Sequence, residues 1–290
     1  YGAENVLATA RRTVPGPVSE GGPFELLDVR DGKAFSEMLG TFRADTVIHL
    51  AGVLSAKGEG DPLSSWDINV CGSCTALEAA RERGAAFFFP SSIAAFGPST
   101  PAKNTPQDTL QRPTTIYGVA KVTMELLCDY YHKKFDMDTR GLRFPGLISY
   151  EALPGGGTTD YAVHIYYDAV SKGSYTSFIA KGTYMDMMYM PDALAAVVKL
   201  MEADPSKLVH RNAFNISAMS FEPEQIAASI RKIMPGFTME YDVDPLRQGI
   251  AESWPDSLDC TAAREEWGFA PEYDLDRMTE DMLRRLKEKN

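Results

Sequence analysis

The residues best suited to chemistry are a tyrosine and a lysine four positions apart, Tyr117 and Lys121, and an upstream serine, Ser92. Residues four apart on a helix lie one turn apart on the same face, so the lysine ammonium can lie near the phenol. A nearby positive charge favours the phenolate, whose ordinary pKa is about 10. We predict that Tyr117 is a base, that Lys121 lowers its pKa, and that Ser92 holds a substrate oxygen.

A Tyr-x-x-x-Lys spacing is common by chance, and the alternative is an amphipathic helix with a buried tyrosine. Ser92 favours catalysis because it follows the apolar run 85–89, which is typical of a buried strand. Serine, tyrosine and lysine in this order and spacing resemble the catalytic set of the short-chain dehydrogenase/reductase superfamily, extended branch.

Alternating strands and helices surround these residues. We predict strands at 5–10, 24–29, 46–52, 85–89 and 139–144 and helices at 31–43, 61–83 and 112–135, with a Pro- and Gly-rich link between the first two strands. This alternation implies a doubly wound parallel α/β sheet of the Rossmann type. Such a sheet binds its ligand outside the carboxyl ends of its strands. Asp28, Ala51, Gly52, Ser92 and Pro145-Gly146 all fall at these ends.

After residue 150 the alternation loosens. We expect strands at 175–179, 187–190 and 213–216 and helices at 160–172, 191–201, 222–234, 261–267 and 275–287. The predicted organisation is a dinucleotide-binding domain over 1–150 and a smaller α/β substrate lobe over 151–290. A return of some segments of the lobe to the main sheet stays open.

The front of the sequence lacks the glycine-rich turn of a dinucleotide-binding sheet. The sequence begins with what looks like the end of the first helix and the second strand, and no G-x-x-G-x-x-G precedes them. We expect that the first strand and its loop have been trimmed away. The alternative, a natural sheet without its central strand, would leave an exposed edge. No glycine-loop residues are assigned.

The end of the second predicted strand bears on the choice of cofactor. An acid there would bind the free ribose hydroxyl of NAD, whereas arginine suits the 2′-phosphate of NADP. The sequence has Ala10-Arg11-Arg12 and no acid. The alternative is that both arginines belong to a solvated loop.

Composition excludes several classes of partner. The net charge of -11 disfavours nucleic acid. No apolar run reaches the roughly 18 residues of a membrane span, and 1–12 does not have the pattern of a signal peptide. We expect a cytoplasmic protein, with a mitochondrial matrix location left open.

Histidines and cysteines form no ligand pattern, so we predict no metal. Cys71 and Cys74 fall in a helical segment and are interpreted as two buried small residues. His49 lies in a strand-like run and is interpreted as a core histidine with satisfied hydrogen bonds.

Longer motifs narrow the function. GGGTTDYA at 155–162 and SWPDSLD at 253–259, with further matches at 54–56, 90–97, 142–149 and 187–192, resemble the short-chain type of L-threonine 3-dehydrogenase over the whole sequence. The resemblance implies oxidation of L-threonine at its hydroxyl carbon by NAD, giving 2-amino-3-oxobutyrate and NADH. It also implies a homodimer that pairs through helices 61–83 and 112–135. Ala10 departs from the acid usual in that family, so use of NADP stays open.

A zwitterionic substrate needs an acceptor for its ammonium and donors for its carboxylate. We predict Asp160 with Thr159 at one end and Ser55 and Ser91 at the other. The alternative for Thr159 and Asp160 is a helix cap. Arg143 is a further candidate for the carboxylate, and a buried structural arginine is its alternative.

The resemblance also implies the cofactor contacts. Asp28 and Val29 would face the adenine, Ala51 and Gly52 the ribose, and Lys121 the nicotinamide ribose. Asn69 would brace the backbone near the active site, and Leu147 would pack near the nicotinamide. The implied set also includes Leu50, Pro145 and Tyr117.

Two rival functions remain. A sugar-nucleotide epimerase or dehydratase on the same scaffold would need a larger pocket and basic groups for a second diphosphate, and few Arg or Lys lie near the glycine turn. A non-catalytic dinucleotide sensor has no reason to keep Ser92, Tyr117 and Lys121 together.

Overall fold

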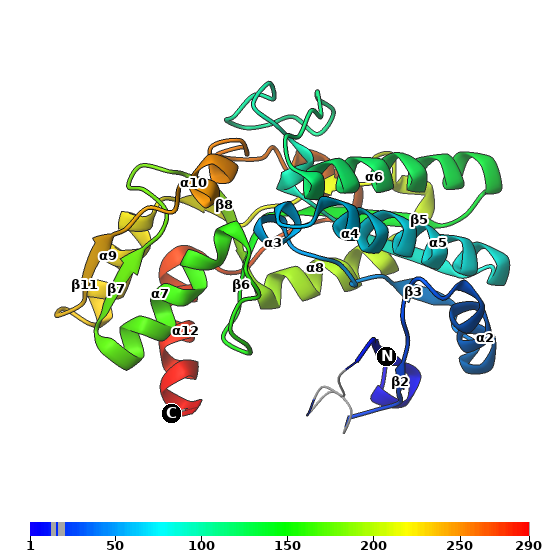
Figure 1. Cartoon of the computed structure of the whole chain (residues 1–290), viewed down its shortest axis with the longest axis horizontal. Helices are drawn as coiled ribbons and strands as arrows, with labels where there is room; N and C mark the ends of the chain where they lie inside the picture. The colour runs from blue at the N-terminus through cyan, green and yellow to red at the C-terminus, as the bar shows by residue number, and fades with distance from the viewer. Residues whose placement is uncertain (13–15, 17–20, 290) are drawn as a thin grey trace.

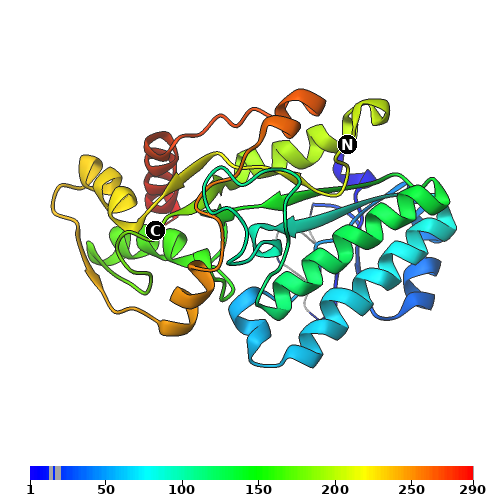
Figure 2. The same cartoon turned by 90° about the horizontal axis from the view of Figure 1, so that it is seen from above.

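The computed structural model describes residues 1–12, 16 and 21–289 and shows a parallel sheet between layers of helices (Figure 1). The main sheet has the order β3-β4-β5-β9. Its strands are β3 (Thr46–Ile48), β4 (Ala86–Ser92), β5 (Thr139–Phe144) and β9 (Phe214–Asn215), all parallel. The two views place α5 (Gly72–Arg83) and α6 (Ile116–Phe135) side by side on one face and α8 (Met190–Glu202) on the other (Figure 2). The predicted Rossmann-type α/β fold with a C-terminal lobe is confirmed.

The first two strands form a sheet of their own. β1 (Ala8–Ala10) pairs in parallel with β2 (Phe24–Leu26). Both are shorter than predicted. Residues 3–5 form a 3₁₀ turn, and β2 ends because the Asp28 side chain accepts a hydrogen bond from the backbone N–H of Arg30 at 3.1 Å, which turns the chain. Residues 13–15 and 17–20 of the predicted link lie outside the described residues.

The helix predicted at 61–83 is a helical run with a change of winding. It consists of α4 (Pro62–Trp66), a π-helical turn (Asp67–Cys71) and α5. The Asp61 carboxylate caps its start by accepting from the N–H of Ser64 at 3.1 Å. Helix α2 (Gly32–Phe42) is capped in the same way by Asp31, as predicted.

The helix that carries Tyr117 begins later than predicted. Residues 112–115 precede α6, and Thr115 is its N-cap, with a hydroxyl that accepts from the N–H of Gly118 at 3.0 Å. Pro113 disfavours helical backbone at Arg112, and the Thr115 cap then makes Ile116 the first helical residue. The correction matters because it places Tyr117 in the first turn of the helix.

The C-terminal half builds a second layered unit. Its sheet has the order β10-β8-β6, where β6 (Gly146–Ile148) and β8 (Met185–Tyr189) are parallel and β10 (Met219–Phe221) is antiparallel. β7 (Ser174–Ser177) pairs with β11 (Thr238–Tyr241). Three helices pack on one another beside these strands: α7 (Tyr161–Lys172), α9 (Pro223–Ile233) and α12 (Leu275–Lys289). Segments of this half also return to the main sheet, because β9 pairs with β5 and α8 packs against β5.

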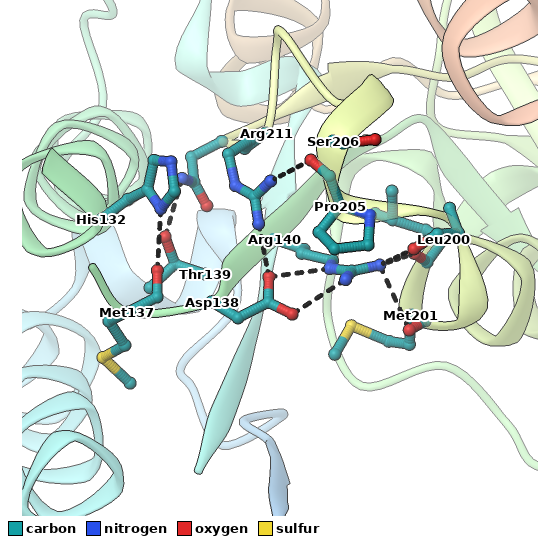
Figure 3. Close-up of polar contacts among 12 residues, drawn as sticks. His132, Met137, Asp138, Thr139, Arg140, Leu200, Met201, Pro205, Ser206 and Arg211 are labelled. Atoms are coloured by element: carbon teal, nitrogen blue, oxygen red, sulfur yellow. Dashed lines mark hydrogen bonds and ion pairs between the residues drawn. The ribbon is translucent and has the colours of Figure 1, made fainter. Parts of the chain in front are cut away.

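A charged cluster closes the starting end of β5 (Figure 3). Arg140 donates to both carboxylate oxygens of Asp138, at 2.9 and 2.8 Å, and to the carbonyl of Leu200 at 2.6 Å. Arg211 donates to Asp138 at 2.6 Å and to the carbonyl of Pro205 at 2.9 Å. Carbonyls at a helix C-terminus need such donors, so the cluster fixes the end of α8 to β5.

Asp186 makes stability depend on pH. This β8 carboxyl is 2 % exposed, and within the described part of the chain its Oδ2 has no hydrogen-bond partner. Burial, the largest cause, raises its pKa to about 7, against about 3.9 for an unfolded chain. The folded state therefore holds a proton that the unfolded state has released, and stability falls as pH rises from about 4 to 7. We expect Asp186→Asn to remove this fall and to be more stable than wild type at pH 8, by about 4 kcal/mol at most.

Urea unfolding at pH 5 and pH 8 measures this difference. Asp138→Asn is the control, since it also changes an aspartate but leaves the Asp186 proton in place. Parallel stability curves for wild type and Asp186→Asn would contradict the assignment.

Across residues 1–12, 16 and 21–289, none of the helices combines the length and the apolar character needed to cross a membrane.

Candidate functional site

The end of β4 and the start of α6 bring Ser92 and Tyr117 together. Ser92 is the last residue of β4, and its hydroxyl accepts from the N–H of Ala94 at 3.2 Å. The helix start can approach this turn because residue 118 is glycine, since a Cβ there would overlap the carbonyl oxygen of Ala94. The Ser92 hydroxyl lies close enough to the Tyr117 phenol to influence its pKa.

Lys121 lies one turn further along α6. Its ammonium donates to the carbonyl of Pro90 at 2.5 Å and lies 5.1 Å from the centre of the Tyr117 ring and 4.7 Å from that of Phe89. The structure thus gathers the three predicted catalytic residues at the carboxyl end of β4, where a doubly wound sheet binds its ligand. Their catalytic role stays a prediction.

Burial sets the protonation of this set. It raises the pKa of the half-buried Tyr117 to about 12, and the nearby Ser92 hydroxyl opposes the rise. Burial also lowers the pKa of Lys121 to about 8, opposed by the charge of Glu125. The predicted lowering of the Tyr117 pKa by Lys121 is therefore not observed. The physical reason is that desolvation of the phenolate outweighs the other influences.

The segment after β3 presents open backbone. Leu50, Ala51 and Gly52 are exposed, with 71 % of Leu50 accessible. The next residue, Val53, is held by Asn69, whose side-chain amide accepts from its N–H at 2.7 Å and donates to its carbonyl at 3.0 Å. A flat cofactor could lie against this segment, so the described residues fit a dinucleotide, and Asn69 lies where a bracing residue would be needed.

His49 belongs to the core, as predicted. Its Nε2 lies 2.9 Å from the Ser73 hydroxyl, and its ring stacks on Phe87. Burial, aided by the charge of Lys121, lowers its pKa to about 4, so the ring is neutral near pH 7.

The residues predicted to face the adenine, Asp28 and Val29, lie after β2. Asp28 accepts from the Arg30 guanidinium at 3.0 and 2.7 Å, which holds the pKa of that carboxyl well below its usual range, and the charge of Arg11 acts in the same direction. Val29 packs against Gly72 of α5. Of the other residues in the predicted cofactor set, Pro145 joins β5 to β6 and Leu147 is half-buried in β6.

One predicted substrate residue, Ser55, lies close to a threonine of the glycine-turn motif. Ser55 begins α3 (Ser55–Glu59), and its hydroxyl is 3.4 Å from that of Thr158, with both residues buried. Sequence reasoning missed Thr158, although it stands in the same GGGTTDYA motif. Thr159 faces Gly146 of β6. Asp160 accepts from the N–H groups of Gly156 at 2.9 Å and Gly157 at 2.6 Å, so it closes the glycine turn as the capping alternative expected.

Ser91 and Arg143 are occupied elsewhere. The Ser91 hydroxyl donates to Glu125, and Arg143 donates to Glu125 at 2.8 Å and to the carbonyl of Gln107 at 2.8 Å. All three side chains are buried. The structure therefore favours the structural alternative for Arg143 and gives Ser91 an internal partner as well. Sequence reasoning missed Glu125, although its position four residues after Lys121 places it on the same helix face.

The cysteines differ in part from the prediction. Cys74 is partly buried in α5, whereas Cys71, in the π-helical turn, is exposed. Within the described ranges, no group of three or more His, Cys, Asp or Glu side chains could hold a metal ion.

Known proteins match the chain over its full length. Residues 1–217 match the NAD dependent epimerase/dehydratase family. An uncharacterized epimerase/dehydratase of Staphylococcus haemolyticus is 60 % identical over 291 aligned residues, covering 100 % of this chain and 91 % of the relative.

Two solved structures are similar to this one. An L-threonine dehydrogenase from Clostridium difficile superposes with a TM-score of 0.98 at 60 % identity, covering 100 % of this chain and 91 % of that one. A monomeric L-threonine 3-dehydrogenase from a metagenome superposes with a TM-score of 0.96 at 39 % identity, covering 100 % and 92 %. With a family match over 217 of 290 residues and a relative this similar, the chain belongs to the NAD dependent epimerase/dehydratase family.

Proposed function

We propose that this protein is an L-threonine 3-dehydrogenase that oxidises the hydroxyl carbon of L-threonine to 2-amino-3-oxobutyrate and transfers a hydride to NAD. The observation that carries the proposal is the convergence of Ser92, Tyr117 and Lys121 in a chain that is similar along its whole length to L-threonine dehydrogenases.

The side chains divide the reaction as follows. Tyr117, as phenolate, takes the proton of the substrate hydroxyl while the adjacent C–H bond breaks and a C=O bond forms. Ser92 donates a hydrogen bond to the reacting oxygen. Lys121, held by the Pro90 carbonyl, keeps a positive charge beside the ring of Tyr117. When bound, the oxidised nicotinamide supplies the acceptor for the hydride.

We place the ammonium and the carboxylate of the substrate at the turn 155–160 and at α3. Both backbone hydrogen bonds to Asp160 use Oδ2, so we assign Oδ1 to the substrate ammonium. We assign the paired hydroxyls of Ser55 and Thr158, with Thr159 beside them, to the carboxylate.

The cofactor preference depends on the end of β1. Ala10 ends that strand, and the exposed Arg11 and Arg12 follow it. Arginine at this position accommodates a 2′-phosphate. We propose NAD as the cofactor and expect the two arginines to allow NADP as well.

The apolar surface of the long helices supports a homodimer. Leu126 and Tyr130 of α6 are 61 % and 52 % exposed, and Leu63 of α4 is 84 % exposed. We propose that these helices pair with a second copy, although one similar structure is described as monomeric. Sedimentation of wild type and Leu126→Glu distinguishes the two states, and a monomer in both would contradict pairing.

The test is the rise in reduced-nicotinamide absorbance on adding L-threonine, with NAD and NADP in parallel. We expect a threonine-dependent rise with NAD and a smaller one with NADP. Ala10→Asp should abolish the rise with NADP and weaken binding of 2′,5′-ADP, measured by calorimetry, because like charges repel. No rise with either cofactor, in folded protein, would reject the proposal and leave a sugar-nucleotide epimerase, to be tested by retention of UDP-sugars.

A further inference from the structure

Three consecutive residues of β4 each contact a different residue on one face of α6. Tyr117, Lys121 and Glu125 are spaced by four, so they occupy three successive turns of that face. The contacts are Tyr117 with the Ser92 hydroxyl, Lys121 with the Pro90 carbonyl at 2.5 Å, and Glu125 with the Ser91 hydroxyl. The helix face that bears Tyr117, the proposed base, therefore also bears the buried carboxylate of Glu125 two turns further along.

Glu125 joins several elements. It is 3 % exposed and accepts from Ser91 on β4, from Gln111 at 2.7 Å, and from Arg143 on β5 at 3.1 and 2.8 Å. Ser91 and Arg143 are partners in the β4–β5 register. Asn215 on β9 holds the same arginine through its side-chain oxygen at 3.1 Å. The Glu125 carboxylate therefore fixes α6 against β4 and β5, and Arg143 links it to β9.

Glu125 also supplies the negative charge that faces Lys121. Its charge opposes the lowering of the Lys121 pKa by burial. Among the described residues, Tyr117 on α6 and His49 after β3 also lie near the ammonium, and His49 is neutral because burial lowers its pKa to about 4. Arg143 is hydrogen-bonded to Glu125.

We propose that Glu125 is a positioning residue for the Ser92–Tyr117–Lys121 set. Its carboxylate holds the catalytic face of α6 in register with residues 90–92 and keeps Lys121 in its charged form. The kinetic part of this inference rests on the proposed function, because it needs turnover of a substrate.

Glu125→Gln tests the role, since glutamine keeps the shape but loses the charge. We expect kcat to fall roughly tenfold to a hundredfold. The pH at which kcat stops rising should also move lower, because Lys121 loses its proton more easily without the carboxylate. An unchanged kcat profile in folded Glu125→Gln would overturn the proposal.

The control is Asp138→Asn, which removes a different carboxylate. Asp138 binds two arginines, Arg140 and Arg211, at the opposite end of β5 (Figure 3). The control variant should lower the melting temperature and leave the pH profile of kcat unchanged. If Glu125→Gln does not fold, Glu125→Asp keeps the charge and shortens the reach. That variant should lower kcat without moving the profile, and an unchanged kcat would again overturn the proposal.

A measurement without turnover separates this inference from the proposed function. The ¹³Cε resonance of Lys121, assigned by its loss in Lys121→Arg, can be titrated in wild type and in Glu125→Gln. We expect a lower midpoint in the variant. A lower midpoint in a protein that does not oxidise threonine would reject the substrate and keep the role of Glu125, whereas equal midpoints would reject the role.

Discussion

Replacing Tyr117 with phenylalanine should lower kcat for threonine oxidation by about 10²- to 10⁴-fold, the usual contribution of a positioned acid or base. The change removes one hydroxyl, which lies beside that of Ser92, so stability should change by only about 1 kcal/mol. Measuring kcat and the melting temperature on the same preparation separates lost chemistry from lost folding.

The pH dependence gives the same variant a second readout. Because burial raises the pKa of Tyr117 to about 12, the reactive phenolate is a minor species near pH 7 and its fraction grows as pH rises. Lys121, with a pKa lowered to about 8 by burial, loses its charge above that pH. Wild-type kcat should therefore climb about tenfold per pH unit below pH 8 and then level off.

In Tyr117→Phe we expect a residual kcat that no longer rises with pH. Ser92→Ala is the matched control, since it removes the partner hydroxyl but leaves the base, and it should lower kcat while keeping the climb. A Tyr117→Phe protein with wild-type activity would favour the non-catalytic sensor.

Some of the fold can be predicted from the sequence because the signals are local. The strand at 139–144 and the helix at 261–267 have the predicted bounds, each with a clear pattern over its length. The sequence does not predict β6, β10 and β11, because strands of three or four residues are too short to show a hydrophobic period. Their place is set by pairing, as in β10 against β8, which is long-range information.

The site shows the same division. The spacing of Ser92, Tyr117 and Lys121 predicts a set that the structure does bring together. A hydroxyl and a guanidinium suit a carboxylate, so the sequence predicts Ser91 as a substrate residue and offers Arg143 as a candidate, with a buried structural arginine as its alternative. That reasoning could not detect that an internal carboxylate, Glu125, already binds both. Whether such a side chain binds the substrate or an internal carboxylate depends on which residues α6 packs against.

Arg143→Met tests whether Arg143 is structural or binds the substrate. It is the variant for which we expect the largest loss of stability. Arg143 and Glu125 form a buried ion pair at 2.8 Å, with side chains 7 % and 3 % exposed. Removing the arginine leaves a buried carboxylate without its main cation, which typically destabilises a protein by about 3–5 kcal/mol. Urea unfolding at pH 7 should show this loss.

A double variant that lacks both charges distinguishes a structural ion pair from an arginine that binds the substrate. A buried pair replaced by apolar side chains of similar volume often restores stability, so Arg143→Met with Glu125→Leu should unfold at a higher urea concentration than Arg143→Met alone. If Arg143 instead bound the threonine carboxylate, Arg143→Met would raise KM strongly with little loss of stability, and the double variant would recover nothing. The buried geometry favours the first outcome, because the carboxylate that Arg143 binds belongs to the protein itself.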